Sequence, residues 1–350
     1  MKEAILKKFR LTDRTTVKVY NGFGHAHHII IYGHVFTFSA LARKRYTHSW
    51  IINFFSLIRL FFVKPIPRAR VRMKWGNQVL FGESELDGFF KFEWASDHEI
   101  SFGWHEVKVE LLDGKDEVIT SGTGSFFVPH STQYGFISDI DDTFLISHSA
   151  SIFKRMYVLF THNARSRKTF NDVVQHYQLL SGAHTSESEP NPFYYVSSSE
   201  WNLYDYIMEF ARVNGMPKGV FLLNQIKRLH QIFKTGKTKH SGKFVRIVRI
   251  LESFPHQRFI LLGDSSQQDP HIYTSIAEKF PGKIHAVYIR DVFEKNSKQT
   301  QETLLRLEQV GVACCFFKNS SEAILHSRKI ALLGPEDVVK VQSSELGAGY

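Results

Sequence analysis

The chain has 350 residues, of which 43% are hydrophobic and 22% are charged, and its formal net charge is +10. This length is enough for two domains with cores of their own, and the composition excludes an intrinsically disordered protein. The N-terminus lacks the pattern of a signal peptide, and the adjacent Cys314 and Cys315 cannot form a disulfide framework or a zinc site. We therefore expect a globular protein of the cytoplasm.

The positive charge is concentrated near the N-terminus. Residues 1–70 contain thirteen Lys and Arg residues but only two acidic residues. Such a concentration suits an anionic membrane, nucleic acid or an acidic protein. No nucleic-acid recognition motif accompanies it, so nucleic acid is not an expected partner.

The first part of the chain has the pattern of a β-protein. Residues 1–14 form a basic N-terminal segment, and residues 15–130 contain short runs of alternating apolar and polar side chains. Turn signals such as Asp87-Gly88 separate these runs, which predicts an antiparallel β-sandwich. The stretches 87–92 and 103–109 resemble transthyretin-like and immunoglobulin-like sandwiches, and this resemblance concerns the fold alone.

A basic and apolar insertion interrupts this pattern at residues 43–64. Its apolar run is shorter than the roughly 20 residues that span a membrane. In a helix, Asn53, Ser56 and Arg59 would lie on one side, opposite an aromatic-rich face. This arrangement is typical either of a helix that lies in a membrane interface or of one buried against a sheet. The first alternative would attach the protein peripherally to an anionic membrane.

The pattern changes to strands that alternate with helices over residues 131–333, before a C-terminal tail at 334–350. Such alternation predicts a parallel sheet. Three of its apolar runs end in the polar residues Asp139, Ser197 and Asp264. Because ligands bind beyond the carboxyl ends of strands in open α/β sheets, we expect these three residues to share one site.

The first of these runs ends in the spacing Asp-x-Asp-x-Thr, which suits phosphoryl transfer. Asp139 is a candidate nucleophile, Asp141 a candidate general acid and base, and Thr143 a candidate hydrogen-bond donor that fixes the loop. Crowded carboxylates also suggest a metal ion, and Asp139, Asp264 and Asp269 offer the oxygen ligands that Mg²⁺ takes. An acidic turn after a strand is the alternative for this stretch alone.

Two further residues fit the same chemistry. The hydroxyl of Ser197 can donate to a phosphoryl oxygen, and Lys243 can balance the charge on the phosphoryl group. Phosphoryl transfer depends mainly on positioning and charge neutralisation, which these groups supply.

The order of these motifs resembles the haloacid dehalogenase superfamily, which implies a Rossmann-like α/β domain. The resemblance implies that Asp139 forms an aspartyl-phosphate and that Asp141 is the acid and base. It also implies that Ser197 and Lys243 bind phosphate, with Thr143 beside them. Mg²⁺ would be held by Asp139, by the backbone carbonyl of Asp141 and by two further acidic residues, Asp264 and Asp269.

A closer resemblance covers almost the whole chain, to the phosphatidate phosphatase family named for the yeast actin-patch enzyme, especially its bacterial members. The matching stretches are 103–107, 138–143, 163–167, 191–199, 201–204, 263–265, 269–273 and 288–292. This resemblance implies Mg²⁺-dependent hydrolysis of phosphatidate to diacylglycerol and phosphate. Arg165 and Arg167 are possible contacts for the substrate, or else a solvated helix end. Lys243 follows Gly242 where a His is common, so Lys239 is a rival for the phosphate-binding lysine.

Two other functions remain open at this point. One is hydrolysis of a different, soluble phosphomonoester. The other is a membrane-surface adaptor whose phosphatase domain is vestigial. The intact pair of Asp139 and Asp141 favours an active enzyme.

Overall fold

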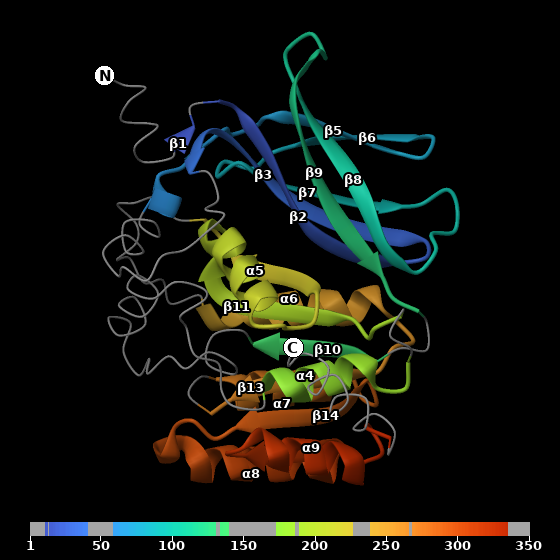
Figure 1. Ribbon diagram of the computed structural model, residues 1–350, viewed down its shortest axis with the longest axis vertical. Coiled ribbons are helices and arrows are strands. Elements are labelled where there is room, and N and C mark those ends of the chain that lie inside the picture. Colours follow the sequence, from blue (N-terminus) through green and yellow to red (C-terminus); the bar gives the residue numbers. More distant parts are fainter. Residues whose placement is uncertain are drawn as a thin grey trace, which may run out of the picture.

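The computed structural model describes residues 11–12, 14–40, 59–130, 134–139, 173–185, 189–226, 239–265 and 268–334. It consists of an N-terminal β-sheet stacked on a second sheet that is covered by helices (Figure 1). The basic residues 1–10, most of the predicted insertion (43–58) and the tail from 335 onward lie outside the described residues. Within the described ranges, no helix is long and apolar enough to cross a membrane.

The N-terminal sheet has nine strands in the described part of the chain. They are β1 (Leu11–Thr12), β2 (Thr16–His25), β3 (His28–Ala40), β4 (Lys64–Pro65), β5 (Arg70–Trp75), β6 (Gln78–Glu83), β7 (Phe89–Ala95), β8 (Gly103–Leu112) and β9 (Val118–Val128). The main order is β1-β3-β2-β9-β8-β5-β6, and β4 and β7 also pair with β3. The neighbouring strands are antiparallel except for one pair.

That exception is β2 with β9, which run parallel, with Gly22 opposite Phe126 and Phe23 opposite Phe127. The prediction of a purely antiparallel sheet is therefore wrong for these two strands. The hairpin rule that makes neighbours antiparallel applies to strands joined by short turns, whereas β2 and β9 come from opposite ends of this region. The hydrogen bonds link all nine strands into one mixed sheet, and the predicted two-layer sandwich stays a prediction.

Burial in this sheet follows the two-residue period of a strand. In β7, for example, Phe90, Phe92 and Trp94 are buried and the residues between them face outward. These side chains pack with Val71 and Phe126 in a core that belongs to the N-terminal sheet alone.

The second sheet is parallel, as the sequence predicted, and has six strands in the described part of the chain. Its strands are β10 (Gly135–Asp139), β11 (Phe193–Glu200), β12 (Gly219–Asn224), β13 (Phe259–Asp264), β14 (Ile284–Arg290) and β15 (Ala313–Phe317). The helices are α4 (Val173–Gly182), α5 (Tyr204–Val213), α6 (Lys239–Ser253), α7 (Asp269–Lys279), α8 (Ser297–Gln309) and α9 (Ser320–Lys329). Short 3-10 helices are η1 (Arg59–Phe61), η2 (Trp201–Leu203) and η4 (Glu294–Asn296).

The strand order places a crevice at a defined point. The order is β12-β11-β10-β13-β14-β15, so the chain builds outward from β10 in one direction and then returns to start β13 on the other side. In such sheets the ligand crevice lies at this reversal, outside the carboxyl ends of the strands. Here those ends are Asp139 of β10 and Asp264 of β13.

The two sheets share a single hydrophobic cluster. The ring of Tyr20 in β2 stacks on Trp201 with centroids 4.2 Å apart, and Phe23 packs edge-on against Tyr194 at 5.5 Å. An ion pair between Lys18 Nζ and Asp205 Oδ2, at 2.6 Å, adds a polar link. Trp201 is buried, with 6% of its surface exposed. The N-terminal sheet thus packs against both ends of β11, at Tyr194 and at Trp201.

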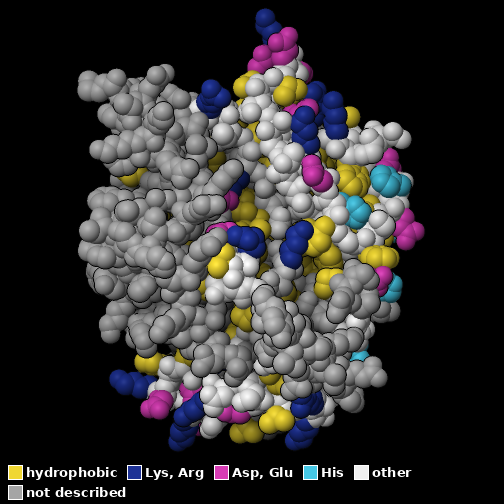
Figure 2. Space-filling view, viewed as in Figure 1, with side chains coloured by type: hydrophobic (Ala, Val, Ile, Leu, Met, Phe, Trp, Pro, Cys, Tyr) yellow, Lys and Arg dark blue, Asp and Glu magenta, His cyan; other side chains and the backbone are white. Residues whose placement is uncertain are grey.

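The surface shows no single basic patch on the face in Figure 2. Lys and Arg side chains of the described residues are scattered there among hydrophobic and acidic ones. Most of the basic residues within 1–70 lie outside the residues whose side chains are described, so the predicted membrane-binding charge stays a prediction.

Two buried histidines predict a pH-dependent stability. Burial lowers the pKa of His34 and of His176 to about 3, whereas a histidine in an unfolded chain has a pKa of about 6.5. Between these values the unfolded chain binds more protons, so the free energy of unfolding falls as the pH is lowered from 6.5. Each histidine should remove about 1–2 kcal/mol by pH 5.

Urea unfolding from pH 7.5 to pH 5 measures this effect. The His34→Phe variant should lose stability less steeply than the wild type, because it removes one titrating group. The exposed His271→Gln serves as the control, and its slope should equal that of the wild type. If the free energy of unfolding of His34→Phe fell with pH as steeply as that of the wild type, the proposed contribution of His34 would be contradicted.

Candidate functional site

Three buried carboxylates meet at the reversal of the strand order. Asp139 ends β10, Asp264 ends β13, and Asp269 is the first residue of α7. They are 1%, 0% and 0% exposed. One ligand oxygen from each lies within 4.8 Å of the others. The structure therefore brings together the three acidic side chains that the sequence nominated for a metal site.

A buried lysine lies against this group. Lys243 Nζ is 2.6 Å from Asp269 Oδ1 and 3.3 Å from Asp139 Oδ1, and its side chain is 3% exposed. The structure thus brings Lys243 to the carboxylates, while the side chain of its rival Lys239 is outside the described residues.

The charge of this cluster fits a divalent cation. Three carboxylates and one ammonium group, counted alone, carry two negative charges, and a cation would lower the cost of burying them. Carboxylate oxygens are also the ligands that hard cations such as Mg²⁺ prefer. On both grounds the residues present could hold a metal ion.

Position 263 has no space for a residue larger than glycine. A Cβ at Gly263 would lie 2.6 Å from Asp269 Oδ2 and 2.9 Å from the ring of Tyr273. The backbone N–H of Asp264 also points to Asp269 Oδ2, at 3.4 Å. Glycine at 263 thus lets the Asp269 carboxylate approach the end of β13.

The loop after β13 is held by hydrogen bonds to the segment after β14. Ser265 Oγ accepts hydrogen bonds from the backbone N–H groups of Val292, at 3.0 Å, and Phe293, at 3.1 Å. The backbone N–H of Ser265 donates to the carbonyl of Arg290 at 2.9 Å. These bonds fix the residue next to Asp264, and therefore the direction of that strand end.

Two tyrosines support the strands beneath the carboxylates. The hydroxyl of Tyr177 is hydrogen-bonded to Ser138 Oγ at 2.8 Å, and Tyr273 donates to the carbonyl of Leu262 at 3.0 Å. Burial raises the pKa of both phenols well above their ordinary value, and nearby carboxylates, Asp139 among them, raise it further. Both tyrosines therefore stay neutral and act as hydrogen-bonding supports. Their sequence positions gave no functional signal.

Ser197 lies beside the first carboxylate. Asp139 is in register with Val196 of the neighbouring β11, and Ser197 is the next residue. The Ser197 side chain is fully buried, its Oγ accepts from the backbone N–H of Ser199 at 2.9 Å, and its carbonyl accepts from Arg246 Nη2 at 3.0 Å. Arg246 was missed from the sequence, although it lies one helical turn after Lys243.

Several predicted residues lie outside the described part of the chain. They are Asp141, Thr143, Arg165 and Arg167. The roles assigned to them stay predictions.

The close approach at Gly263 is open to a direct test. In Gly263→Ala the new methyl group must displace the Asp269 carboxylate or the ring of Tyr273, and we expect the free energy of unfolding to fall by about 1–3 kcal/mol. A Cβ at Gly182 would meet nothing within 4 Å, so Gly182→Ala is the matched control and should leave stability unchanged or raise it by up to about 1 kcal/mol. Urea unfolding measures both, and equal stabilities would contradict the proposed crowding.

Residues 134–291, which contain the three carboxylates, Lys243 and Ser197, match the family described as phosphatidate phosphatase APP1, catalytic domain. Phosphatidate phosphatase APP1 of Saccharomyces cerevisiae is 31% identical over 162 residues, which are 45% of this chain and 25% of that protein. An uncharacterized protein of Schizosaccharomyces pombe is 23% identical over 190 residues, which are 53% of this chain and 30% of that protein. The chain thus spans less than a third of the length of these relatives.

Among solved structures, a carbohydrate acetylesterase from Xanthomonas citri aligns with a TM-score of 0.29 and 9% identity, over 85% of this chain and 74% of that one. This score is too low to indicate a shared fold. The family match and the yeast relative carry the same description, and the family match covers the region that carries the site. Through residues 134–291, the chain is similar to the catalytic domain of APP1-type phosphatidate phosphatases.

Proposed function

We propose that the protein is a Mg²⁺-dependent phosphatase that hydrolyses phosphatidate to diacylglycerol and phosphate. The observation that carries this proposal is the buried group of Asp139, Asp264, Asp269 and Lys243 at the crevice of the parallel sheet. The family match over the same region supports the substrate class.

The reaction proceeds in two steps on Asp139. A carboxylate oxygen of Asp139 attacks phosphorus, the bond from phosphorus to the alcohol oxygen breaks, and Asp141 gives a proton to the leaving alcohol. Asp141 then takes a proton from water, which attacks the aspartyl-phosphate and releases phosphate. The position of Asp139 at a strand end, with a buried lysine 3.3 Å away, supports its assignment as the nucleophile.

The remaining groups neutralise and orient the phosphoryl group. Lys243 and the hydroxyl of Ser197 would contact phosphoryl oxygens, with Thr143 beside them. Mg²⁺ bound by Asp139, Asp264, Asp269 and the backbone carbonyl of Asp141 would supply further positive charge at those oxygens. Asp269 would share its carboxylate between the cation and Lys243, to which it is bonded at 2.6 Å.

The proposal also includes an assignment of the two domains. We assign residues 131–333 to a haloacid-dehalogenase-type domain and residues 15–130 to a β-sandwich domain. The central position of β10, with Asp139 at its end, supports the first assignment. We further propose that the insertion at 43–64 holds the protein on an anionic membrane surface, where phosphatidate is presented.

Metal binding is testable apart from catalysis. Calorimetric titration with Mg²⁺ should show one site in the wild type and none in Asp264→Asn, which removes one ligand charge. At a Mg²⁺ concentration 100 times its Kd, the wild type should gain about 2.7 kcal/mol of stability. Asp205→Asn, which changes an acidic residue that pairs with Lys18 and is not part of the cluster, should bind as the wild type does. Undiminished binding in Asp264→Asn would refute the proposed ligand set.

Activity is measured as phosphate release from phosphatidate in mixed micelles and from a panel of soluble phosphomonoesters. Asp139→Asn should abolish release, because the nucleophile is lost. Asp141→Asn should lower the rate by about 10²–10⁴-fold, the usual contribution of a general acid. The wild-type protein is assayed beside both variants, and its rate of phosphate release should depend on Mg²⁺.

The outcomes separate the alternatives. Release from soluble esters alone would keep the chemistry and exclude phosphatidate as the substrate. No release from any substrate, with liposome binding retained, would favour a membrane-surface adaptor.

A further inference from the structure

A pocket of about 250 Å³ lies where the N-terminal sheet meets the parallel sheet. Its lining comes from β3 and the turn before β7, from η2 and the end of β12, and from α6. The N-terminal sheet therefore contributes side chains to a cavity of the α/β region, in addition to the packing contacts already described.

Helix α6 links this pocket to the candidate site. Arg246 lines the pocket and donates to the carbonyl of Ser197 at 3.0 Å. Lys243, three residues earlier on the same face of the helix, is 3.3 Å from Asp139. One turn of α6, from Lys243 to Arg246, therefore separates the carboxylate group from the lining of this pocket.

One lining residue carries a buried polar atom that calls for a ligand. His34 is 0% exposed, and its Nδ1 is hydrogen-bonded to the hydroxyl of Tyr20 at 3.0 Å. Its Nε2 is buried and has no hydrogen-bond partner among the residues that the structure describes. The bond to Tyr20 decides whether Nε2 carries a proton. A ligand hydroxyl group can both donate and accept a hydrogen bond, so it could bond to Nε2 with or without the proton. An ester carbonyl could do so when Nε2 carries the proton.

The charges around the pocket favour a neutral ligand group. Arg246 and Arg249 of α6 line it, and so do Glu85 and Asp87 from the turn before β7. A neutral group with donors and acceptors can bond to both pairs, whereas a second anionic group would face two carboxylates. The volume of about 250 Å³ is large enough for a glycerol unit.

We propose that this pocket is a subsite for the neutral, hydroxyl- or ester-bearing alcohol portion of the phosphomonoester substrate, with Arg249 and His34 as specificity-determining residues. The proposal rests on the proposed function for the position of the phosphate. It makes the N-terminal sheet part of substrate recognition.

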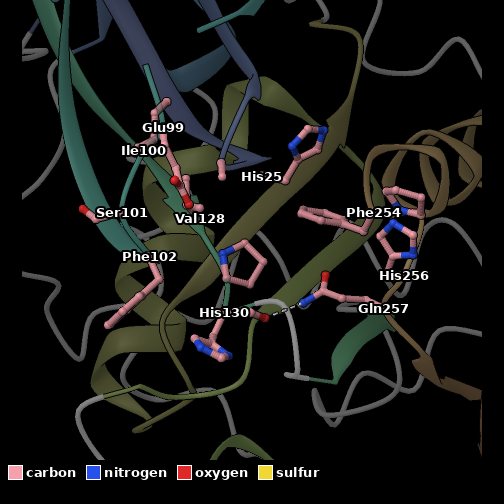
Figure 3. A pocket seen from close by; sticks show the side chains of 13 residues that line it. His25, Glu99, Ile100, Ser101, Phe102, Val128, His130, Phe254, His256 and Gln257 are labelled. Carbon is pink, nitrogen blue, oxygen red and sulfur yellow. Dashed lines mark hydrogen bonds between the residues drawn. The ribbon is translucent and has the colours of Figure 1, made fainter. Parts of the chain in front are cut away.

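A larger pocket, of about 700 Å³, lies at the opposite end of the sheet and does not serve this role. Figure 3 shows it between Phe102 and His130 on one side and Phe254 and Gln257 on the other. Residues 254–257 lead into the start of β13, so this pocket is separated from Asp264 by the length of the strand.

The experiment measures binding without turnover. Asp139→Asn protein, with Mg²⁺ present, is titrated calorimetrically with dibutyryl phosphatidate, glycerol 3-phosphate and inorganic phosphate. The same titrations are made after adding Arg249→Gln, His34→Phe or, as the control, the exposed Arg306→Gln on α8. Circular dichroism verifies that each variant is folded.

We expect Arg249→Gln to weaken binding of one or both alcohol-bearing ligands by about tenfold or more, and to leave binding of inorganic phosphate unchanged. His34→Phe should act in the same direction, and Arg306→Gln should change nothing. A loss confined to dibutyryl phosphatidate identifies ester recognition, and a loss for glycerol 3-phosphate identifies hydroxyl recognition.

Equal losses for all three ligands, or no loss for any, would overturn the subsite. The subsite would also be overturned if the protein with wild-type pocket side chains bound neither dibutyryl phosphatidate nor glycerol 3-phosphate more tightly than inorganic phosphate. Failure of the proposed function looks different, because the selective binding would then persist while the protein with Asp139 intact releases no phosphate from phosphatidate.

Discussion

Three carboxylates within 4.8 Å of one another, in a site closed to water, are the constraint on which the rest of the α/β region depends. Like charges at this separation repel, and burial removes the solvent that would screen them. Lys243 offsets part of this cost through contacts with Asp139 and Asp269. Because Lys243 belongs to α6 and Asp269 begins α7, the pairing also fixes how these two helices sit against the sheet.

The surrounding structure shows how the strand ends are kept in place. Gly263 leaves space for the Asp269 carboxylate, and Ser265 ties the end of β13 to the segment after β14. The neutral hydroxyl groups of Tyr177 and Tyr273 form hydrogen bonds to Ser138 of β10 and to Leu262 of β13. A rigid shell of this kind keeps charged groups at fixed distances, which is what electrostatic stabilisation of a phosphoryl group requires.

The parts of the site that could be predicted follow from local rules. Asp139, Ser197 and Asp264 each end an apolar run, and parallel strands bring their carboxyl ends to one edge, so their convergence was predictable. The parallel pairing of β2 with β9 and the role of Arg246 were not. Both depend on contacts between segments far apart in sequence, and an apolar period or a lone arginine on a helix carries no information about its partner.

The junction between the sheets argues that the α/β region is not self-sufficient. The family match begins at residue 134 and omits the N-terminal sheet. Yet Tyr20 and Phe23 cover Trp201 and Tyr194, and full burial of a large apolar side chain contributes about 1.5–3 kcal/mol. Without the N-terminal sheet, these aromatic faces would be exposed next to β11, the strand that carries Ser197. The geometry at the carboxyl end of β11 therefore depends on residues more than a hundred positions away in the sequence.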